Sequence, residues 1–143
     1  MQVETVLSGR PIESASALVH AMFAAELDSP VLTSGHDLGA LAGPLRVDVA
    51  RDAEVYTKIS GKEQRLSAGD MVVRDGGGVI ASVVYGPDFR TRIRLESSAA
   101  LFGAWGPVGL TTDVVAAHLD RLAGLVREEW PDAAVEPPRL FMG

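Results

Sequence analysis

Residues 69–105 decide the fold of this chain, and their sequence is GDMVVRDGGGVIASVVYGPDFRTRIRLESSAALFGAW. Two apolar runs, Met71–Asp75 and residues 79–85, lie on either side of the triplet Gly76-Gly77-Gly78. Because glycine tolerates the positive φ angles of tight turns, the pattern predicts an antiparallel β-hairpin. A phosphate-binding loop is excluded, since a Walker-type loop continues through Gly-Lys-Ser/Thr into a helix and residues 79–85 have strand character. An arginine-bearing segment and a small-residue apolar run follow the hairpin.

Two further segments have the 3.6-residue period of amphipathic helices. The first is residues 11–27, where Pro11 suits the first turn and the helix should end before the next proline. Ser14 or Ser16 could act as the N-cap of an inner start. The second is residues 112–130, which begin at a Thr-Asp pair and stop at a proline. Both apolar stripes are typical of packing against a core rather than of a ligand site.

Short strands should lie between the helices, because apolar and polar residues alternate there, most cleanly in residues 45–50. The expected strands are residues 31–33, 45–50, 54–59, 71–75 and 79–85. This order predicts an α+β fold with a mostly antiparallel sheet and an N-terminal and a C-terminal helix. We expect residues 1–143 to form a single domain whose tail, residues 131–143, is irregular.

Composition narrows the functional classes. The formal net charge is −6, and the arginines and lysines form no block. Because nucleic-acid binding relies on neutralising phosphates, we expect weak or no bulk nucleic-acid binding. Cysteine is absent, which excludes disulfides and thiolate metal sites, and no apolar run reaches the length of a membrane span. We therefore expect a bacterial-type cytoplasmic protein with no membrane contact, no metal and no cofactor.

Short motifs follow one another in a fixed order through the chain. They are Gly35, Asp37 and Leu38, then Gly69-Asp70, the glycine turn after Asp75, Arg90-Thr91-Arg92, Glu96-Ser97-Ser98 and Ala100-Leu101-Phe102. Their order and spacing resemble the B3/B4 domain of the phenylalanyl-tRNA synthetase β chain and its free-standing relatives, over roughly residues 11–135. The resemblance implies a B3/B4-like fold in an N-terminally truncated and diverged member of that family.

The resemblance also implies an editing activity, the hydrolysis of the ester bond of a mischarged tRNA. Such a site must orient a water molecule and recognise the polar end of the amino acid, which suits a carboxylate or a hydroxyl. Here the family's acidic residue corresponds to Ala104 or Trp105, and its polar pair corresponds to Val83-Val84. The leading hypothesis is therefore binding of an amino-acid-like or aminoacyl small ligand in the family pocket, with residual aminoacyl-tRNA editing (deacylase) activity left open.

Two alternatives involve different chemistry. One is a specialised secondary-metabolism enzyme that reuses the pocket, so the question of whether the chain is an enzyme stays open. The other is a non-catalytic interaction module. In that case a homodimer would cover the apolar surface that a truncated domain leaves exposed.

Three residues are candidates for catalysis. His20 corresponds to a position where the resemblance implies an acidic residue facing the cleft. Asp88 lies on a loop directly after a predicted strand, where functional side chains often project. Ser98 retains a hydroxyl near the family's threonine. The alternatives are structural, namely a packed histidine at His20 and ordinary Pro-Asp turn chemistry at Asp88.

The candidates for ligand binding are Arg90, Arg92, Tyr85 and Trp105. On a strand, Arg90, Arg92 and Arg94 would point to one face, and guanidinium groups suit carboxylates or phosphates. The alternative is a solvated face with ion pairs to acidic neighbours such as Asp88 and Glu96. The two aromatic residues either line a pocket or fill the core.

The remaining two histidines have simpler interpretations. His36 is expected to form a local turn hydrogen bond with Asp37, and His118 is expected at a surface or an interface. With His20 they share no ligand-type spacing such as His-x-x-x-His, so no metal site is expected from them.

Overall fold

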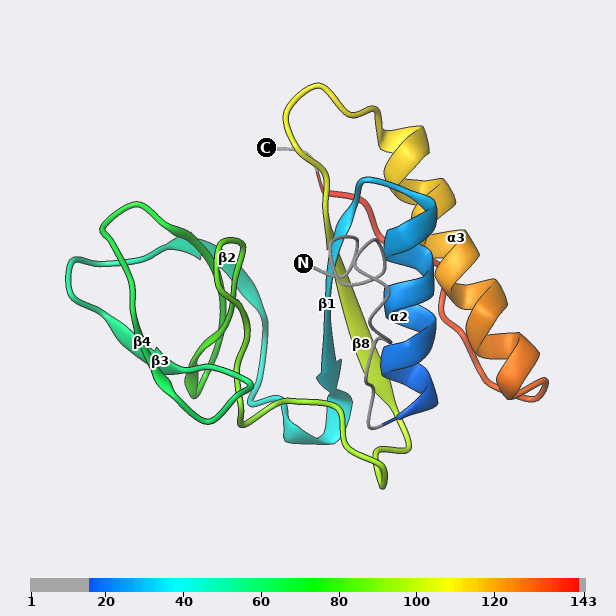
Figure 1. Cartoon of the computed structure of the whole chain (residues 1–143), viewed down its shortest axis with the longest axis horizontal. Helices are drawn as coiled ribbons and strands as arrows, with labels where there is room; N and C mark the ends of the chain where they lie inside the picture. Colours follow the sequence, from blue (N-terminus) through cyan, green and yellow to red (C-terminus); the bar gives the residue numbers. More distant parts are fainter. Residues whose placement is uncertain (1–15, 142–143) are drawn as a thin grey trace, which may run out of the picture. The chain divides into compact units, whose positions relative to one another are not determined.

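A computed structural model of the chain describes residues 16–141 (Figure 1). The expectations for Pro11 and Ser14 lie outside the described residues. The chain forms two compact units, one containing residues up to Thr33 and from Ala104 onwards, the other containing Ser34–Gly103. We call the first the helical unit and the second the strand unit. That all 143 residues form a single domain stays a prediction.

The helical unit contains two helices that pack side by side, α2 (Ala17–Asp28) and α3 (Thr112–Glu129) (Figure 1). Helix α2 begins at an N-cap, because Val19 N donates to Ser16 Oγ over 3.3 Å. It ends at Asp28, as the following proline predicts. Helix α3 has the predicted start and ends one residue before the predicted Trp130. No helix within residues 16–141 is long and apolar enough to cross a membrane.

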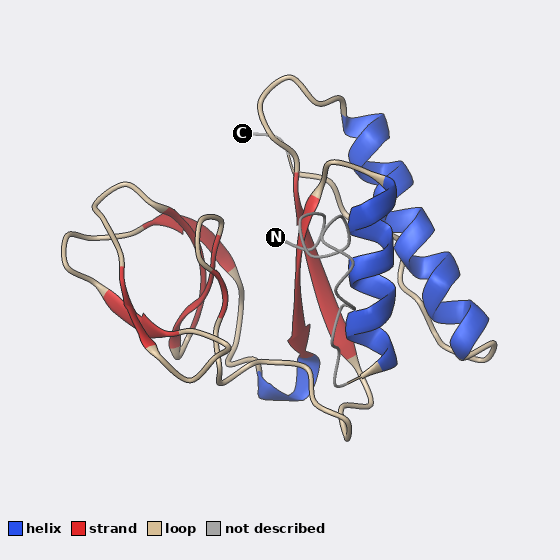
Figure 2. Ribbon diagram, viewed as in Figure 1, coloured by secondary structure: helices blue, strands red, loops and turns tan. Residues whose placement is uncertain are grey.

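The strand unit is built from short antiparallel strands (Figure 2). Four of them form one sheet in the order β2-β5-β6-β7, and β3 and β4 form a separate pair. Their bounds are β2 Arg46–Val49, β3 Val55–Thr57, β4 Glu63–Arg65, β5 Met71–Asp75, β6 Gly78–Ser82 and β7 Gly86–Pro87. A small core unites them, made of Ala50, Tyr56, Leu66, Val72 and Val79.

A third, two-stranded sheet pairs β1 (Leu32–Asp37) with β8 (Ala100–Trp105). The short 3-10 helix η1 (Leu38–Ala40) follows β1 directly. The boundary between the two units runs through both strands of this sheet. With the two helices, these sheets confirm the predicted α+β class and the mostly antiparallel pairing.

The predicted glycine hairpin is present between β5 and β6, where Asp75 pairs with Gly78. Gly76 N donates to the carbonyl of Ala42 over 2.6 Å, and a Cβ at Gly76 would lie only 2.6 Å from that oxygen. A Cβ at Gly77 would lie 2.8 Å from Nη2 of Arg90. The first two glycines are therefore required by close approach of neighbouring groups, in agreement with a structural turn.

Three details of the predicted strands are wrong. The first strand continues past residue 33 to Asp37, and β6 stops at Ser82 because the Ser82 hydroxyl accepts the amides of Val84 and Tyr85 in a turn. The described residues 90–94 contain no strand. Their backbone is held at single points, such as the bond from Asp37 N to the carbonyl of Thr91, 2.7 Å. Burial still alternates there, with Thr91 and Ile93 inside.

Candidate functional site

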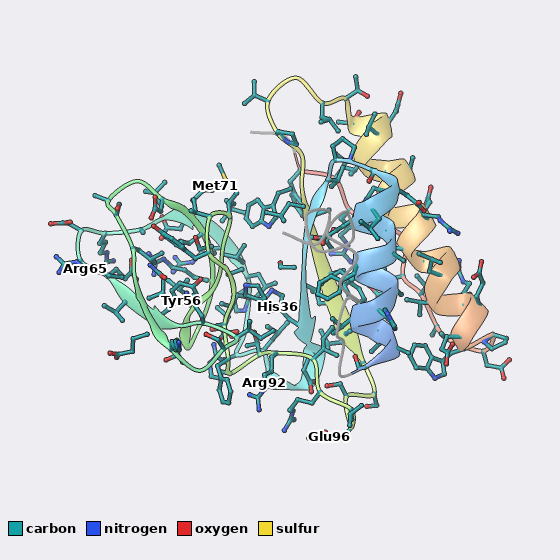
Figure 3. The ribbon with its side chains drawn as sticks, viewed as in Figure 1. His36, Tyr56, Arg65, Met71, Arg92 and Glu96 are labelled. Atoms are coloured by element: carbon teal, nitrogen blue, oxygen red, sulfur yellow. The ribbon has the colours of Figure 1, made fainter. Side chains whose placement is uncertain are left out.

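The strand unit contains a series of hydrogen-bonded buried polar side chains that includes His36, which is labelled in Figure 3. His36 is 2% exposed, and its two ring nitrogens contact two hydroxyls. Nδ1 lies 2.7 Å from Thr91 Oγ1, and Nε2 lies 3.2 Å from Ser34 Oγ. Thr91 Oγ1 in turn donates a hydrogen bond to Asp88. We call this series Ser34, His36, Thr91 and Asp88 the His36 chain.

The local structure explains why these four side chains meet. Ser34 and His36 are two residues apart on β1, so both point to the same face of the strand. Asp88 and Thr91 close a short turn, in which Thr91 N donates to Asp88 Oδ1 over 3.1 Å. The backbone bond from Asp37 N to the Thr91 carbonyl joins this turn to β1.

Arg90 holds the far end of the His36 chain. Its Nη2 donates to Asp75 Oδ1 over 2.6 Å, its Nη1 donates to the carbonyl of Ala40 over 3.0 Å, and its Nε lies 3.9 Å from Asp88 Oδ2. Burial opposes the charge of Asp75, but the hydrogen bonds from Arg90 and from the amides of Ala42 and Gly77 outweigh it and lower the pKa of Asp75. Two carboxylates therefore share one guanidinium.

The electrostatics of the site favour a neutral imidazole. Burial lowers the pKa of His36, and the nearby charges of Asp88 and Asp75 only partly oppose this effect. A neutral imidazole has one donor and one acceptor nitrogen, so it can relay a proton between two hydroxyls. The arrangement is thus suited to holding a ligand by a hydroxyl of fixed orientation, or to general acid–base chemistry at that hydroxyl.

The other end of the His36 chain is the hydroxyl of Ser34, whose residue is 6% exposed. On β8, Gly103 lies beside it, and a Cβ at Gly103 would stand 3.5 Å from Ser34 Oγ. A methyl group at this position would therefore make an ordinary van der Waals contact with the hydroxyl. Gly35, by contrast, has no room, since its Cβ would lie 2.8 Å from Cδ1 of Ile93.

The helical unit contains a second buried histidine. The prediction that His118 lies at a surface is wrong, because the residue is 3% exposed. Nδ1 lies 2.6 Å from Ser29 Oγ, and Nε2 lies 2.6 Å from Thr33 Oγ1. Thr33 N also donates to Glu26 Oε1 over 2.7 Å. Burial lowers the pKa of His118 and raises the pKa of Glu26. We call Ser29, His118 and Thr33 the His118 bridge.

The sequence candidates occupy different places. Asp88 and Arg90 come together at the end of the His36 chain. Arg92 lies outside it, with its guanidinium 3.6 Å from the centroid of the Phe89 ring and bonded to the Phe89 carbonyl. Tyr85 is 39% exposed in the turn after β6. The ion pairs expected from the structural alternative are also present, since Arg94 contacts Glu96 at 3.1 Å.

Within residues 16–141, the remaining candidates make no polar contact that would define a site. His20 is exposed on α2, and Trp105 is half-buried at the end of β8; both belong to the helical unit. Ser98 is exposed and has no side-chain partner among residues 16–141. Its neighbour Ser97 instead donates to Asp37 Oδ2 over 2.6 Å, and this bond is the main reason why the pKa of Asp37 is lowered. The roles proposed for these residues stay predictions.

Sequence reasoning missed Ser34, Thr91 and the role of His36. The expected bond between His36 and Asp37 is wrong, because the His36 ring bonds to Thr91 and Ser34, while Asp37 caps Gly39 N. Residues 33–37 are buried at every position although most of them are polar, so no apolar alternation marked the full length of β1. Within the described residues, no group of three or more His, Asp or Glu side chains is placed to hold a metal ion.

Comparisons with known proteins find similarity among solved structures. No protein-family model matches the chain, and no curated protein matches it. Its structure is similar to an N-terminal fragment of the phenylalanyl-tRNA synthetase β-subunit from Pyrococcus horikoshii, with a TM-score of 0.66 and 12% sequence identity. The match covers 78% of this chain and 39% of that fragment, so the chain spans about two fifths of its length. The similarity shows a shared fold, and the finer B3/B4 assignment stays a prediction.

Proposed function

We propose that this protein binds an amino-acid-like or aminoacyl small ligand, and that the hydroxyl of Ser34 is the polar group that meets it. The observation that carries the proposal is the His36 chain, which runs from the Asp88 carboxylate to Ser34 through side chains that are all buried. Such a chain fixes the position and the direction of its last hydroxyl before a ligand arrives.

Two further observations support this proposal. A Cβ at Gly103 would stand 3.5 Å from Ser34 Oγ, in ordinary van der Waals contact, and we assign that position to an atom of the ligand. Binding sites commonly combine a few fixed polar groups with apolar walls, and the apolar side chains of Ile93 and Phe102 pack around the neighbouring Gly35. The fold shared with a synthetase β-subunit fragment is compatible with a ligand that resembles an amino acid.

Calorimetric titration with the twenty amino acids and their methyl esters tests the proposal. We expect saturable binding that Ser34→Ala weakens at least about tenfold, the loss of one oriented hydrogen bond in a buried site. Ser98→Ala is the matched control, because it removes an exposed hydroxyl of the same unit. Equal affinity in the Ser34→Ala and Ser98→Ala variants, or no binding by the wild type, would refute the proposed function.

A steric variant gives an independent check. Gly103→Ala places a methyl group in ordinary van der Waals contact with Ser34 Oγ, so the fold should tolerate it while the space beside the hydroxyl is filled. We expect weaker binding without loss of thermal stability. Gly124→Ala is the control, because a Cβ there meets no atom within 4 Å. If Gly103→Ala binds as tightly as Gly124→Ala, the ligand lies elsewhere.

A second candidate function is hydrolysis of an aminoacyl ester, and one observation favours it. A neutral histidine nitrogen faces a serine hydroxyl at 3.2 Å, which is the arrangement of a general base next to a hydroxyl or water. Release of the amino acid from mischarged tRNA and from amino-acid methyl esters would be measured. We expect activity to fall in His36→Gln and to persist in His20→Gln. No turnover above the uncatalysed rate would exclude hydrolysis and leave binding intact.

A further inference from the structure

Thr91 occupies the one position in the His36 chain where the direction of the hydrogen bonds is decided. It is fully buried, and its hydroxyl lies between His36 Nδ1 and the Asp88 carboxylate. A threonine hydroxyl has a single proton, whereas an ionised carboxylate only accepts. Asp88 Oδ1 accepts from both the hydroxyl and the amide of Thr91, and the Arg90 guanidinium lies 3.9 Å from Asp88 Oδ2. The hydroxyl proton of Thr91 is therefore given to Asp88.

The remaining directions follow one by one. Because the hydroxyl hydrogen of Thr91 is already donated to Asp88, Thr91 Oγ1 can only accept a hydrogen bond from His36. Nδ1 of the His36 ring therefore carries a hydrogen. A buried neutral imidazole then has a bare Nε2, and the hydroxyl of Ser34 must donate to it. The proton of Ser34 therefore points inward, and only the lone pairs of its oxygen are left for a ligand.

We infer that Thr91 is a positioning residue that makes Ser34 a hydrogen-bond acceptor, so that the site takes the amine or amide N–H end of a ligand and disfavours a carboxylate or carbonyl end. The ligand part of this inference rests on the proposed function. The part about the direction of the chain rests on the described contacts alone. A carboxylate oxygen brought to Ser34 would face the lone pairs of Ser34 Oγ, and neither group could donate a hydrogen bond to the other. This contact between two acceptors lowers the affinity for a carboxylate.

Nitrogen-15 NMR of the histidine rings tests the direction of the chain without any ligand. In the wild type near pH 7.5 we expect His36 to be a neutral ring with its hydrogen on Nδ1. Thr91→Val removes the acceptor but keeps the shape, so the hydrogen should move toward Nε2, and Thr91→Ser should restore the Nδ1–H form. A wild-type ring with hydrogen on Nε2, or a doubly protonated ring, would overturn the inference even if the variants fail to fold.

Affinity for two matched sets of probes tests the choice of ligand end. Amino-acid amides have N–H donors and no carboxylate, whereas the corresponding deaminated carboxylic acids have a carboxylate and no N–H. We expect the wild type to prefer the amides at least about tenfold, the value of one hydrogen bond that is made in one case and lost in the other. Thr91→Val should reduce the ratio of the two affinities, and Thr91→Ser should restore it to the wild-type value.

Thr57→Val is the matched control, because Thr57 is exposed in the same unit and should leave the ratio unchanged. A preference for the deaminated acids, or a ratio of affinities that Thr91→Val does not change, would overturn the assignment of Thr91. If neither set binds, the proposed function fails and its ligand preference with it, while the ring tautomer of His36 still decides the direction of the chain.

Discussion

The His36 chain and the His118 bridge have the same central element, a buried imidazole between two hydroxyls, but they differ at one end. His36 is connected through Thr91 to the Asp88 carboxylate. His118 lies between Ser29 and Thr33, and neither of these hydroxyls has a carboxylate partner among residues 16–141. The two hydroxyls of the bridge are therefore not tied to a carboxylate that would fix the direction of their hydrogen bonds.

The difference separates two uses of a buried histidine. The His118 bridge satisfies polar groups where α2, β1 and α3 meet in the helical unit, and its effect is on stability. The His36 chain also satisfies its members, but the carboxylate orients it and leaves one hydroxyl with a defined polarity. Four experiments test whether the two histidines differ in this way.

The largest effect should come from removing the carboxylate. Asp88→Ala deprives the Thr91 hydroxyl and amide of their acceptor and Arg90 of a nearby charge. We expect the free energy of unfolding to fall by about 3 kcal/mol in urea denaturation, because buried donors are left unpaired. Ser98→Ala should change it by less than about 0.5 kcal/mol. A loss below about 1 kcal/mol in Asp88→Ala would show that the carboxylate does not anchor the chain.

The next effect separates the two histidines by function. His36→Gln should weaken ligand binding at least about tenfold, or about 1.4 kcal/mol, because the group that orients Ser34 is altered. His118→Gln should change binding less than about twofold, since its partners are Ser29 and Thr33. Calorimetry on the two variants gives the comparison. Equal losses in both would mean that binding follows general stability rather than the His36 chain.

Acid should destabilise the protein through both histidines in the same direction. Burial lowers both native pKa values, so below the ordinary histidine value of about 6.5 the unfolded state takes up protons first. Stability is then fully present above pH 6.5 and is lost as the pH falls toward the native pKa values, at no more than about 1.4 kcal/mol per pH unit for each histidine.

Urea midpoints measured from pH 7.5 to pH 5 in the wild type, His36→Gln and His118→Gln check this dependence. The urea midpoint of each variant should fall less steeply with decreasing pH than that of the wild type, because one titrating histidine has been removed. A wild-type midpoint that stays constant over this range would contradict the neutral state of both rings.

The smallest effect concerns the hydroxyls alone. Ser29→Ala removes one partner of His118 and should cost about 1 kcal/mol of stability while binding stays unchanged. Ser34→Ala should cost a similar amount but reduce binding, because only its hydroxyl ends the oriented chain. Thermal unfolding together with calorimetry measures both quantities. A loss of binding in Ser29→Ala would remove the functional distinction between the two units.

Local sequence signals were sufficient for much of the fold. The hairpin was predictable because a glycine triplet separates two apolar runs, and α3 because its stripe is bounded by a Thr-Asp pair and a proline. Strand β4 was missed because Glu63-Gln64-Arg65 is polar throughout and has no apolar alternation. Residues 90–94 were considered as a strand because arginines alternate there with other residues. The structure has no strand at these positions, and their backbone is held by single hydrogen bonds rather than by a ladder of strand pairing.

The candidate site was less predictable because its contacts are long-range. The bond between His36 and Thr91 joins residues 55 apart, and the bond between Thr33 and His118 joins residues 85 apart. No local pattern encodes such pairs. The resemblance drew attention to the Arg90-Thr91-Arg92 segment, yet the residue that enters the His36 chain is the threonine between the two arginines.

The most direct test of the central claim is a titration of the ¹⁵N-labelled wild-type protein with amino-acid amides, followed by NMR. We expect the ring and amide signals of His36 and Thr91 to shift together and to saturate, while those of Ser29 and His118 stay in place. The account is contradicted if no signal saturates, or if the His118 bridge responds and the His36 chain does not.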